Sequence, residues 1–155
     1  IDYVINLQGD EPMIDIEDIK NLNSNGIKYK SEIATLACKI KDKNILNQSN
    51  IVKVITDEKI SKENMSRANT FSRKISFNYN ANIYHHIGIY MYKVSILEKL
   101  VNLKQSKNEI DHRLEQLRAI DNNMKINVIL ANSSPIGVDT EEDFLELKKI
   151  MNYKK

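Results

Sequence analysis

The chain has 155 residues, of which 41% are hydrophobic, so it is long enough to bury the core of one domain. Its 23 basic and 21 acidic residues nearly cancel, which argues against a nucleic-acid-binding protein or one that binds an anionic membrane surface. The single cysteine, Cys38, excludes an internal disulfide. The sequence shows no long apolar run and no signal-peptide pattern, so we expect a cytoplasmic protein without membrane insertion.

The first half of the chain predicts strands and one helix. Residues 3–7 (YVINL) form a short apolar run of the kind found in a strand buried on both faces. Asp15 begins a helical pattern, which we expect Ser24-Asn25-Gly26 to end. Residues 33–40 (IATLACKI) and 51–56 (IVKVIT) are rich in β-branched side chains and predict strands. The polar stretch that follows gives no clear pattern.

The second half repeats this alternation. Residues 86–92 (HIGIYMY) predict a strand, and Ser95 is expected to cap a helix that runs to Val101. Residues 109–121 place apolar side chains at helical spacing, residues 125–131 predict a further strand, and Thr140 is expected to cap a final helix. Strands that alternate with helices predict one α/β domain over residues 1–155.

A candidate site follows the first strand. In an open α/β sheet, ligands bind beyond the carboxyl ends of the strands, and LQGDEP lies at such a position. Gly9 lets the backbone approach a ligand closely, Asp10 is a suitable ligand for a hard cation, and Pro12 fixes the exit of the loop. The same residues are also typical of an ordinary turn from strand to helix, and the heptapeptide alone does not separate the two interpretations.

A second aspartate follows the last predicted strand. Asp139 lies in GVDT, where the final helix begins. Magnesium is usually held by one or two carboxylates, with phosphates and waters completing its shell, so Asp10 and Asp139 are a candidate pair. Taken alone, Asp139 is also a common helix-entry residue.

Other polar residues have a structural and a functional interpretation. His85 and His86 are neighbours on a strand and point to opposite faces, so at most one of them faces a site. Glu115-Gln116 lies on a predicted helix whose polar face is ordinarily solvated, and Arg73 is a guanidinium suited to a carboxylate. The sequence contains no Walker or Rossmann glycine loop, nucleophile elbow, CxxC or HExxH, so covalent catalysis and structural zinc have little support.

Six motifs together resemble a known family. NLQGDEPMI, IATLACKI, NIVKV, HHIGIYMYK, LEQLRA and GVDTEEDF occur in this order from residue 3 to about residue 150. This pattern closely resembles the carboxyl-terminal part of the 3-deoxy-manno-octulosonate cytidylyltransferases, the CMP-Kdo synthetases of lipopolysaccharide biosynthesis.

The resemblance implies a fold, a reaction and a set of site residues. The fold would be a Rossmann-like α/β/α sandwich of the nucleotide-diphospho-sugar transferase type, truncated at the amino terminus, and the family is typically homodimeric. The reaction would join CTP and Kdo to give CMP-Kdo and pyrophosphate, with magnesium required. By resemblance, Asp10 and Asp139 would hold the magnesium and act in catalysis, and six residues would bind substrate: Gln8, Arg73, His86, Tyr90, Glu115 and Gln116. Arg67 is an alternative match for the arginine.

The chain also departs from the family's pattern. It begins at Ile1, just before a predicted buried strand, so we expect a fragment without the family's amino-terminal nucleotide-binding segment and with little or no activity alone. His112 stands where the family usually has an acidic residue. Two alternatives stay open: a cytidylyltransferase for another acidic sugar, such as a sialic acid, and a non-catalytic fragment that pairs with another chain.

Overall fold

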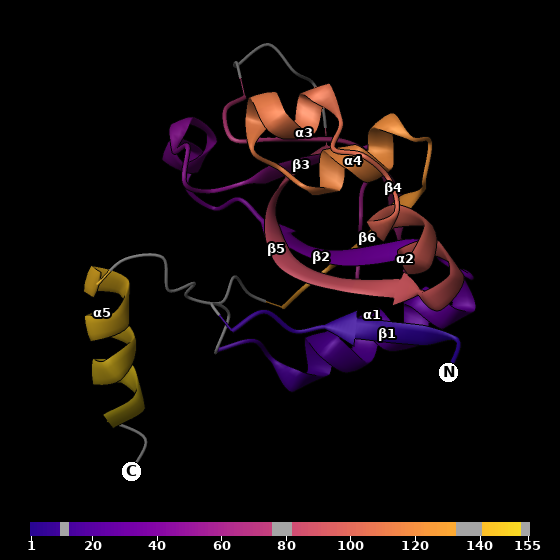
Figure 1. Ribbon diagram of the computed structural model, residues 1–155. Coiled ribbons are helices and arrows are strands. Elements are labelled where there is room, and N and C mark those ends of the chain that lie inside the picture. Colours follow the sequence, from indigo (N-terminus) through magenta and orange to yellow (C-terminus); the bar gives the residue numbers. More distant parts are fainter. Residues whose placement is uncertain (10–12, 76–81, 133–140, 153–155) are drawn as a thin grey trace.

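A computed structural model of the chain describes residues 1–9, 13–75, 82–132 and 141–152 (Figure 1). In this part of the chain the elements are, in order, β1 (Tyr3–Asn6), α1 (Ile16–Lys28), β2 (Ile33–Lys39), the 3-10 helix η1 (Lys43–Asn47), β3 (Lys53–Thr56), β4 (Ser66–Ser72), β5 (Asn82–Lys93), α2 (Val94–Val101), α3 (Lys107–His112), α4 (Gln116–Asp121), β6 (Ile126–Leu130) and α5 (Glu141–Asn152). None of these helices is long and apolar enough to cross a membrane.

The strands form one mixed sheet in the order β1-β5-β2-β6-β4-β3. The long strand β5 pairs antiparallel with β1, β2 and β3, and β2 pairs parallel with β6. Because β3 pairs with both β4 and β5, the pairings of β2, β6, β4, β3 and β5 form a closed circuit. β1 and β2 are both antiparallel to β5, and β6 is parallel to β2, so β1 and β6 run in the same direction. Their carboxyl ends lie at the same edge of the sheet.

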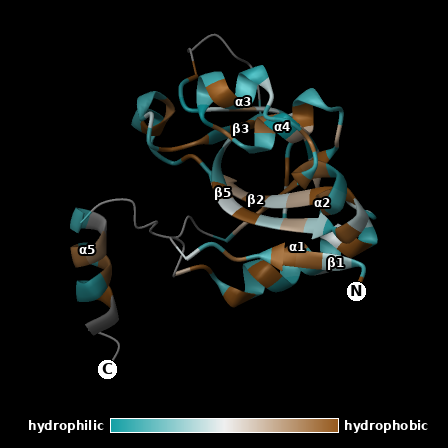
Figure 2. Cartoon of the chain, in the orientation of Figure 1, coloured by the Kyte–Doolittle hydropathy of each residue, from teal (hydrophilic) through white to brown (hydrophobic). Residues whose placement is uncertain are grey.

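Helices cover both faces of the sheet, which gives three layers (Figure 1). On one face Leu22 of α1 packs with Ile87 and Met91 of β5 in a buried cluster. On the other face Leu100 of α2 and Leu117 of α4 belong to a second cluster around the central strands. In Figure 2 α1 carries both hydrophobic and hydrophilic segments, as expected of a helix with one face on a sheet.

Two helix boundaries differ from the expectations. α1 does not end at Gly26 but continues to Lys28, because Gly26 is a buried helical residue that lets α1 approach Met91 closely. The chain leaves the helix at Lys30, which has a left-handed backbone with φ of 49°. Asp15 is the N-cap as expected, and its carboxylate accepts the N–H of Glu17. α2 is preceded by Lys93, so Ser95 lies inside the helix and does not cap it.

The predicted helix over residues 109–121 is wrong, because the structure has two short helices there. Arg113 interrupts the helical path with a left-handed backbone, φ 52° and ψ 49°. The break lets Leu114 and Leu117 both pack on the sheet while Ile110 stays 58% exposed. The spacing of apolar residues did not reveal this break, since both short helices keep the same periodicity.

The middle of the chain contains a strand that the sequence did not predict. β4 buries the small residues Ser66 and Ala68 and exposes Arg67 and Asn69, and after a register shift at Asn69 it buries Phe71. The strand predicted over 51–56 is confirmed only from Lys53, and β5 begins four residues before the predicted start. The predicted cap of the final helix, Thr140, lies outside the described residues, while the helix itself is confirmed as α5.

Candidate functional site

The end of the loop that follows β1 is fastened to the start of the loop that follows β6. Asn132, two residues after β6, donates its backbone N–H to both carboxylate oxygens of Asp18, at 2.9 and 3.0 Å. Its side-chain amide donates to Asp15 at 3.0 Å. Asp15 and Asp18 belong to the first turn of α1, which follows the LQGDEP loop. Asp10 and Asp139, the predicted magnesium ligands, lie in these two loops but outside the described residues.

Asp18 is a buried acidic residue that was not among the predicted site residues. Its side chain is 2% exposed, and burial raises its pKa while the hydrogen bond from Asn132 opposes the rise. A buried carboxylate needs such donors to stay ionised. The sequence did contain an indication that Asp18 is buried. Asp18, Leu22 and Asn25 lie three or four residues apart and so share the buried face of α1.

Four of the six predicted substrate-binding residues line one cavity. Gln8, Tyr90, Glu115 and Gln116 surround a volume of about 50 Å³ together with six other residues: Asn6, Ile33, Tyr92, Leu100, Ala119 and Ile126. The side chain of Glu115 is 76% exposed, so the cavity lies close to the protein surface. Gln8 and Gln116 are over a hundred residues apart in the sequence. The pairing of β1 with β5 and the packing of α4 against β5 residues bring them together.

Tyr90 presents an unpartnered hydroxyl in this region. It is 6% exposed, and its hydroxyl is the one buried side-chain polar atom without a hydrogen-bond partner among the residues that the structure describes. Burial raises the pKa of Tyr90 well above its usual value, and Tyr92 and Glu115 add to the rise. Burial and Glu115 likewise raise the pKa of Tyr92 to about 12. Both tyrosines therefore keep their protons at neutral pH and can donate them to a ligand.

His86 is not among the residues that line the cavity, but its ring contacts that of Tyr90, which is one of them. Its ring centroid is 5.4 Å from that of Tyr90 and 5.0 Å from that of Phe71. Burial lowers the pKa of His86 to about 3, with a smaller contribution from His85, so the ring is neutral. Its Nε2 lies 3.0 Å from the hydroxyl oxygen of Thr35. As expected for neighbours on a strand, only His86 of the pair is fully buried.

A bulge in β5 lies beside these residues. Along β2, Thr35 pairs with Tyr90 and Leu36 pairs with Ile87, so Gly88 and Ile89 have no counterpart in the register. A Cβ atom at Gly88 would lie 3.1 Å from Oε1 of Gln8. Glycine therefore lets the Gln8 side chain lie close against the bulged strand.

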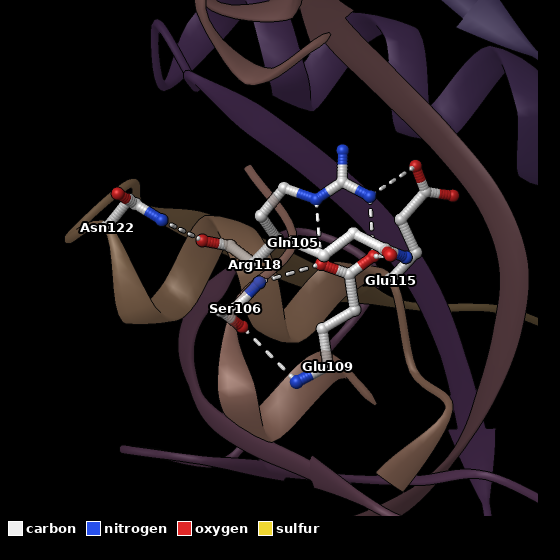
Figure 3. Close-up of polar contacts among 6 residues, drawn as sticks. All are labelled: Gln105, Ser106, Glu109, Glu115, Arg118 and Asn122. Carbon is white, nitrogen blue, oxygen red and sulfur yellow. Dashed lines mark hydrogen bonds and ion pairs between the residues drawn. The ribbon is translucent and has the colours of Figure 1, made fainter. Parts of the chain in front are cut away.

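The start of α4, which carries Glu115 and Gln116, is held by a buried ion pair (Figure 3). Glu109 of α3 accepts from Nε of Arg118 at 2.8 Å and from Nη2 at 2.5 Å. Glu109 also accepts the N–H of Ser106 in a capping box and the amide of Gln105. These donors, the Arg118 guanidinium first, hold the pKa of Glu109 at about 2. Arg118 lies 3.7 Å from Glu115, so the pair ties α3 to the residue at the cavity.

Arg73 does not line this cavity. Its guanidinium donates to three backbone carbonyls, those of Ser49 at 3.1 Å, His112 at 3.4 Å and Arg113 at 3.2 Å. Arg73 therefore fastens the turn between α3 and α4. Arg67, the alternative match, is an exposed residue of β4.

A larger hollow, of about 770 Å³, lies on another part of the protein. Residues of β3, β4, α3 and α4 line it, including Thr70, His112 and Asp121, together with Asp57, which follows β3. None of the candidate site residues that the structure describes lines this hollow. We therefore place the candidate site at the smaller cavity, where amide, phenol and carboxylate groups converge on a space suited to a hydroxylated ligand.

The sequence matches the family model described as cytidylyltransferase over residues 1–126. The chain belongs to the cytidylyltransferase family. The residues of β1, β2 and β5 that build the cavity all fall within the matched range, and so do those of α4.

Within this family, the chain is similar to enzymes that act on one sugar acid. The cytidylyltransferase chain is 39% identical over 148 residues to 3-deoxy-manno-octulosonate cytidylyltransferase of Bartonella henselae, and 40% identical over 153 residues to that of Thermodesulfovibrio yellowstonii. Each alignment covers 96% of this chain and 60% of the relative. The chain thus spans about 60% of the length of the curated relatives that it matches.

Solved structures support the same fold. A CMP:2-keto-3-deoxy-manno-octonic acid synthetase complexed with CTP superposes with a TM-score of 0.86 at 30% identity, over 99% of this chain and 63% of that one. UDP-glucose pyrophosphorylase superposes with a TM-score of 0.70 at 17% identity, over 99% of this chain and 55% of that one, a likeness of fold alone. The expected nucleotide-diphospho-sugar transferase fold, an α/β sandwich, is confirmed.

Proposed function

We propose that the chain is the sugar-binding and metal-binding part of an enzyme that joins CTP and Kdo to give CMP-Kdo and pyrophosphate, for lipopolysaccharide biosynthesis. One observation carries the proposal. Gln8, Tyr90, Glu115 and Gln116, named from a resemblance to the CMP-Kdo synthetases, line one cavity in the folded chain. The relatives and the solved synthetase that carries CTP support the same reaction.

In the proposed reaction the anomeric hydroxyl of Kdo attacks the α-phosphorus of CTP, and pyrophosphate leaves. This displacement needs positioning and charge stabilisation, and no covalent intermediate on the protein. The amides of Gln8 and Gln116 and the hydroxyl of Tyr90 would orient the sugar by hydrogen bonds, and the Glu115 carboxylate would accept from its hydroxyls. In this structure the 50 Å³ cavity has room for a few water molecules, which the sugar would displace as the exposed Glu115 side chain turns outward.

Magnesium is part of the proposal, with Asp10 and Asp139 as its ligands. When bound, the ion would neutralise charge on the phosphate oxygens of CTP. The Asn132 contacts to Asp15 and Asp18 support this pairing, because they hold the end of the loop with Asp10 beside the start of the loop with Asp139. A dinuclear or all-protein cage is not required, since magnesium commonly uses one or two carboxylates.

Arg73 does not line the cavity but binds the turn directly before Glu115, so the sugar acid would meet its remaining N–H groups where the sugar extends past Glu115. A guanidinium carries five N–H donors, and three backbone carbonyls occupy three of them here. Arg73 would then serve two purposes, fastening the α3–α4 turn and facing the acid. We further propose that the whole enzyme is located in the cytoplasm and forms a homodimer.

The test is an activity assay on the chain preceded by the amino-terminal segment of a CMP-Kdo synthetase. We expect pyrophosphate release that depends on CTP, Kdo and magnesium together. A panel with N-acetylneuraminate in place of Kdo separates the two acidic sugars. Absence of pyrophosphate release with every sugar, from a folded protein, would contradict the proposal and favour a non-catalytic fragment.

Substitution of a proposed metal ligand gives a sharper expectation. In the same joined protein Asp139→Asn should lower turnover by about a hundredfold or more while the fold persists, because it removes one negative charge from the metal. Circular dichroism and turnover at saturating magnesium measure both effects. Near-normal turnover would exclude Asp139 as a ligand.

A further inference from the structure

Thr35 is a buried threonine of β2 whose hydroxyl contacts three groups of β5. Its Oγ1 lies 2.7 Å from the carbonyl oxygen of Ile89 and 3.2 Å from that of Ile87. It also lies 3.0 Å from Nε2 of His86. Thr35 is 0% exposed, and these contacts place its hydroxyl across the bulge formed by Gly88 and Ile89.

The chemistry of these partners determines which group donates. A threonine hydroxyl has one proton, and a carbonyl oxygen can only accept. The proton of Thr35 therefore points to Ile89, the nearer carbonyl. A proton directed at His86 would instead leave the lone pairs of Oγ1 facing two carbonyl oxygens with no hydrogen between them. Nε2 of His86 thus carries a hydrogen and donates it to Thr35, and Nδ1 carries the lone pair.

The surroundings of His86 hold this ring in place. Phe71 meets it edge-on, with interplanar angle 80°, and Tyr90 lies on it at 50°. Burial keeps the ring neutral at physiological pH. A neutral imidazole whose Nε2 hydrogen is committed to Thr35 stays in one orientation, and its ring packs against Tyr90, which lines the cavity.

We propose that Thr35 is a positioning residue that holds His86 in the tautomer protonated at Nε2 and thereby fixes the His86 ring against Tyr90, whose side chain lines the cavity proposed for the sugar. The assignment of the tautomer stands on the contacts above, whereas the part about the sugar rests on the proposed function. Thr35 itself touches neither the cavity nor the reacting atoms. Nothing in the sequence distinguishes Thr35 from the other residues of its apolar strand.

The first experiment reads the tautomer directly in the 155-residue chain. Histidine labelled with ¹⁵N and long-range ¹H–¹⁵N correlation spectra distinguish a protonated ring nitrogen from one with a lone pair, and the spectrum of His86→Gln assigns the signal among three histidines. We expect Nε2–H in the unsubstituted chain and in Thr35→Ser, which keeps the hydroxyl. In Thr35→Val the ratio of tautomers should move about tenfold toward Nδ1–H, the effect of losing one hydrogen bond.

Thr56→Val is the matched control. Thr56 is also a buried strand threonine, 2% exposed, and its hydroxyl donates to the carbonyl of Glu58 at 2.7 Å without touching a histidine. Its loss should leave the His86 spectrum unchanged. Should Thr35→Val fail to fold, Thr35→Ala provides the same deletion with less bulk. A protonated Nδ1 in the unsubstituted chain, or an unchanged His86 spectrum in folded Thr35→Val or Thr35→Ala, overturns the proposal.

The second experiment concerns the sugar. In the joined protein described above, Thr35→Val should raise KM for Kdo about tenfold, with KM for CTP changed less than about twofold, and Thr35→Ser should recover most of the loss. An equal rise in both KM values would contradict the link to the sugar. No CMP-Kdo formation by the unsubstituted joined protein would contradict the proposed function instead, and the spectra would still decide the tautomer.

Discussion

Two buried tyrosines of β5 differ in whether their hydroxyl groups have a partner. The hydroxyl of Tyr84 accepts the N–H of Ile60 at 3.2 Å, while that of Tyr90 has no partner in the described structure. A buried polar group without a partner costs free energy, so its presence suggests a use other than stability. The proposed sugar supplies that use.

Replacement by phenylalanine should separate the two tyrosines. Tyr90→Phe should leave the free energy of unfolding unchanged or raise it by up to about 1 kcal/mol, because no hydrogen bond is lost. Tyr84→Phe, the control, should lower it by about 1 kcal/mol, because the Ile60 N–H loses its acceptor. Urea denaturation measures both. A clear loss of stability in Tyr90→Phe would mean that its hydroxyl has a partner in the free protein.

His86 should make stability depend on pH. Its pKa is about 3 in the folded chain and about 6.5 in the unfolded chain. Between these values the unfolded chain binds a proton that the folded chain does not, so stability falls as the pH falls, by about 1.4 kcal/mol per pH unit. His86→Gln should remove this part of the slope. Urea denaturation of both proteins at pH 7 and pH 5 tests this, and parallel slopes would contradict a neutral buried ring.

At the scale of elements, the pair Glu109–Arg118 joins α3 to α4. Side-chain exposures of 5% and 12% leave this pair little contact with water. This buried ion pair therefore holds α3 against the start of α4, where Glu115 and Gln116 lie. Arg73 fastens the same turn from the other side through the carbonyls of His112 and Arg113.

Glu109→Gln should lower the free energy of unfolding by about 3 kcal/mol, because it leaves the Arg118 guanidinium buried without its counter-charge. The surface pair of Lys20 and Glu17, about two-thirds exposed, provides the control. Glu17→Gln should change stability by less than about 0.5 kcal/mol. Denaturation by urea measures both, and equal effects would show that burial of the first pair has no consequence.

The sequence predicted elements whose buried residues are apolar and whose spacing is regular. β2 and β6 were predicted for this reason, whereas α5 was predicted from the cap at Thr140. β1 was predicted from its apolar run, but its residues are only partly buried. β4 was missed, because its buried face includes Ser66, and the break at Arg113 was missed, because a change of one backbone angle pair leaves the apolar spacing intact. Periodicity reports which face is buried and not where the backbone turns.

At the scale of the molecule, the pairing of the strands determines the order in which they lose their hydrogen bonds by local unfolding. β2 is buried along six of its residues and pairs on both sides, with β5 and with β6. β1 pairs with β5, and no second strand partner is found for it in the described part of the chain. Local opening should therefore begin at β1 and reach β2 last.

Amide hydrogen exchange tests this order. Hydrogen-bonded amides of β2 should exchange only by global unfolding, and those of β1 about a hundredfold faster. Mass spectrometry or NMR on the 155-residue chain measures both. Equal protection of β1 and β2 would show that β1 is covered by a further contact.

The sequence by itself determined the α/β class, the polar groups at the strand ends and, through six motifs, the resemblance to the CMP-Kdo synthetases. These are properties of residue type and order along the chain. The tertiary structure decided which residues meet. It placed Gln8 beside Tyr90, Glu115 and Gln116, used Arg73 to bind three carbonyls, and set Thr35 against His86. Such contacts depend on strand register, on the bulge at Gly88 and on the break between α3 and α4, which no local pattern in the sequence reports.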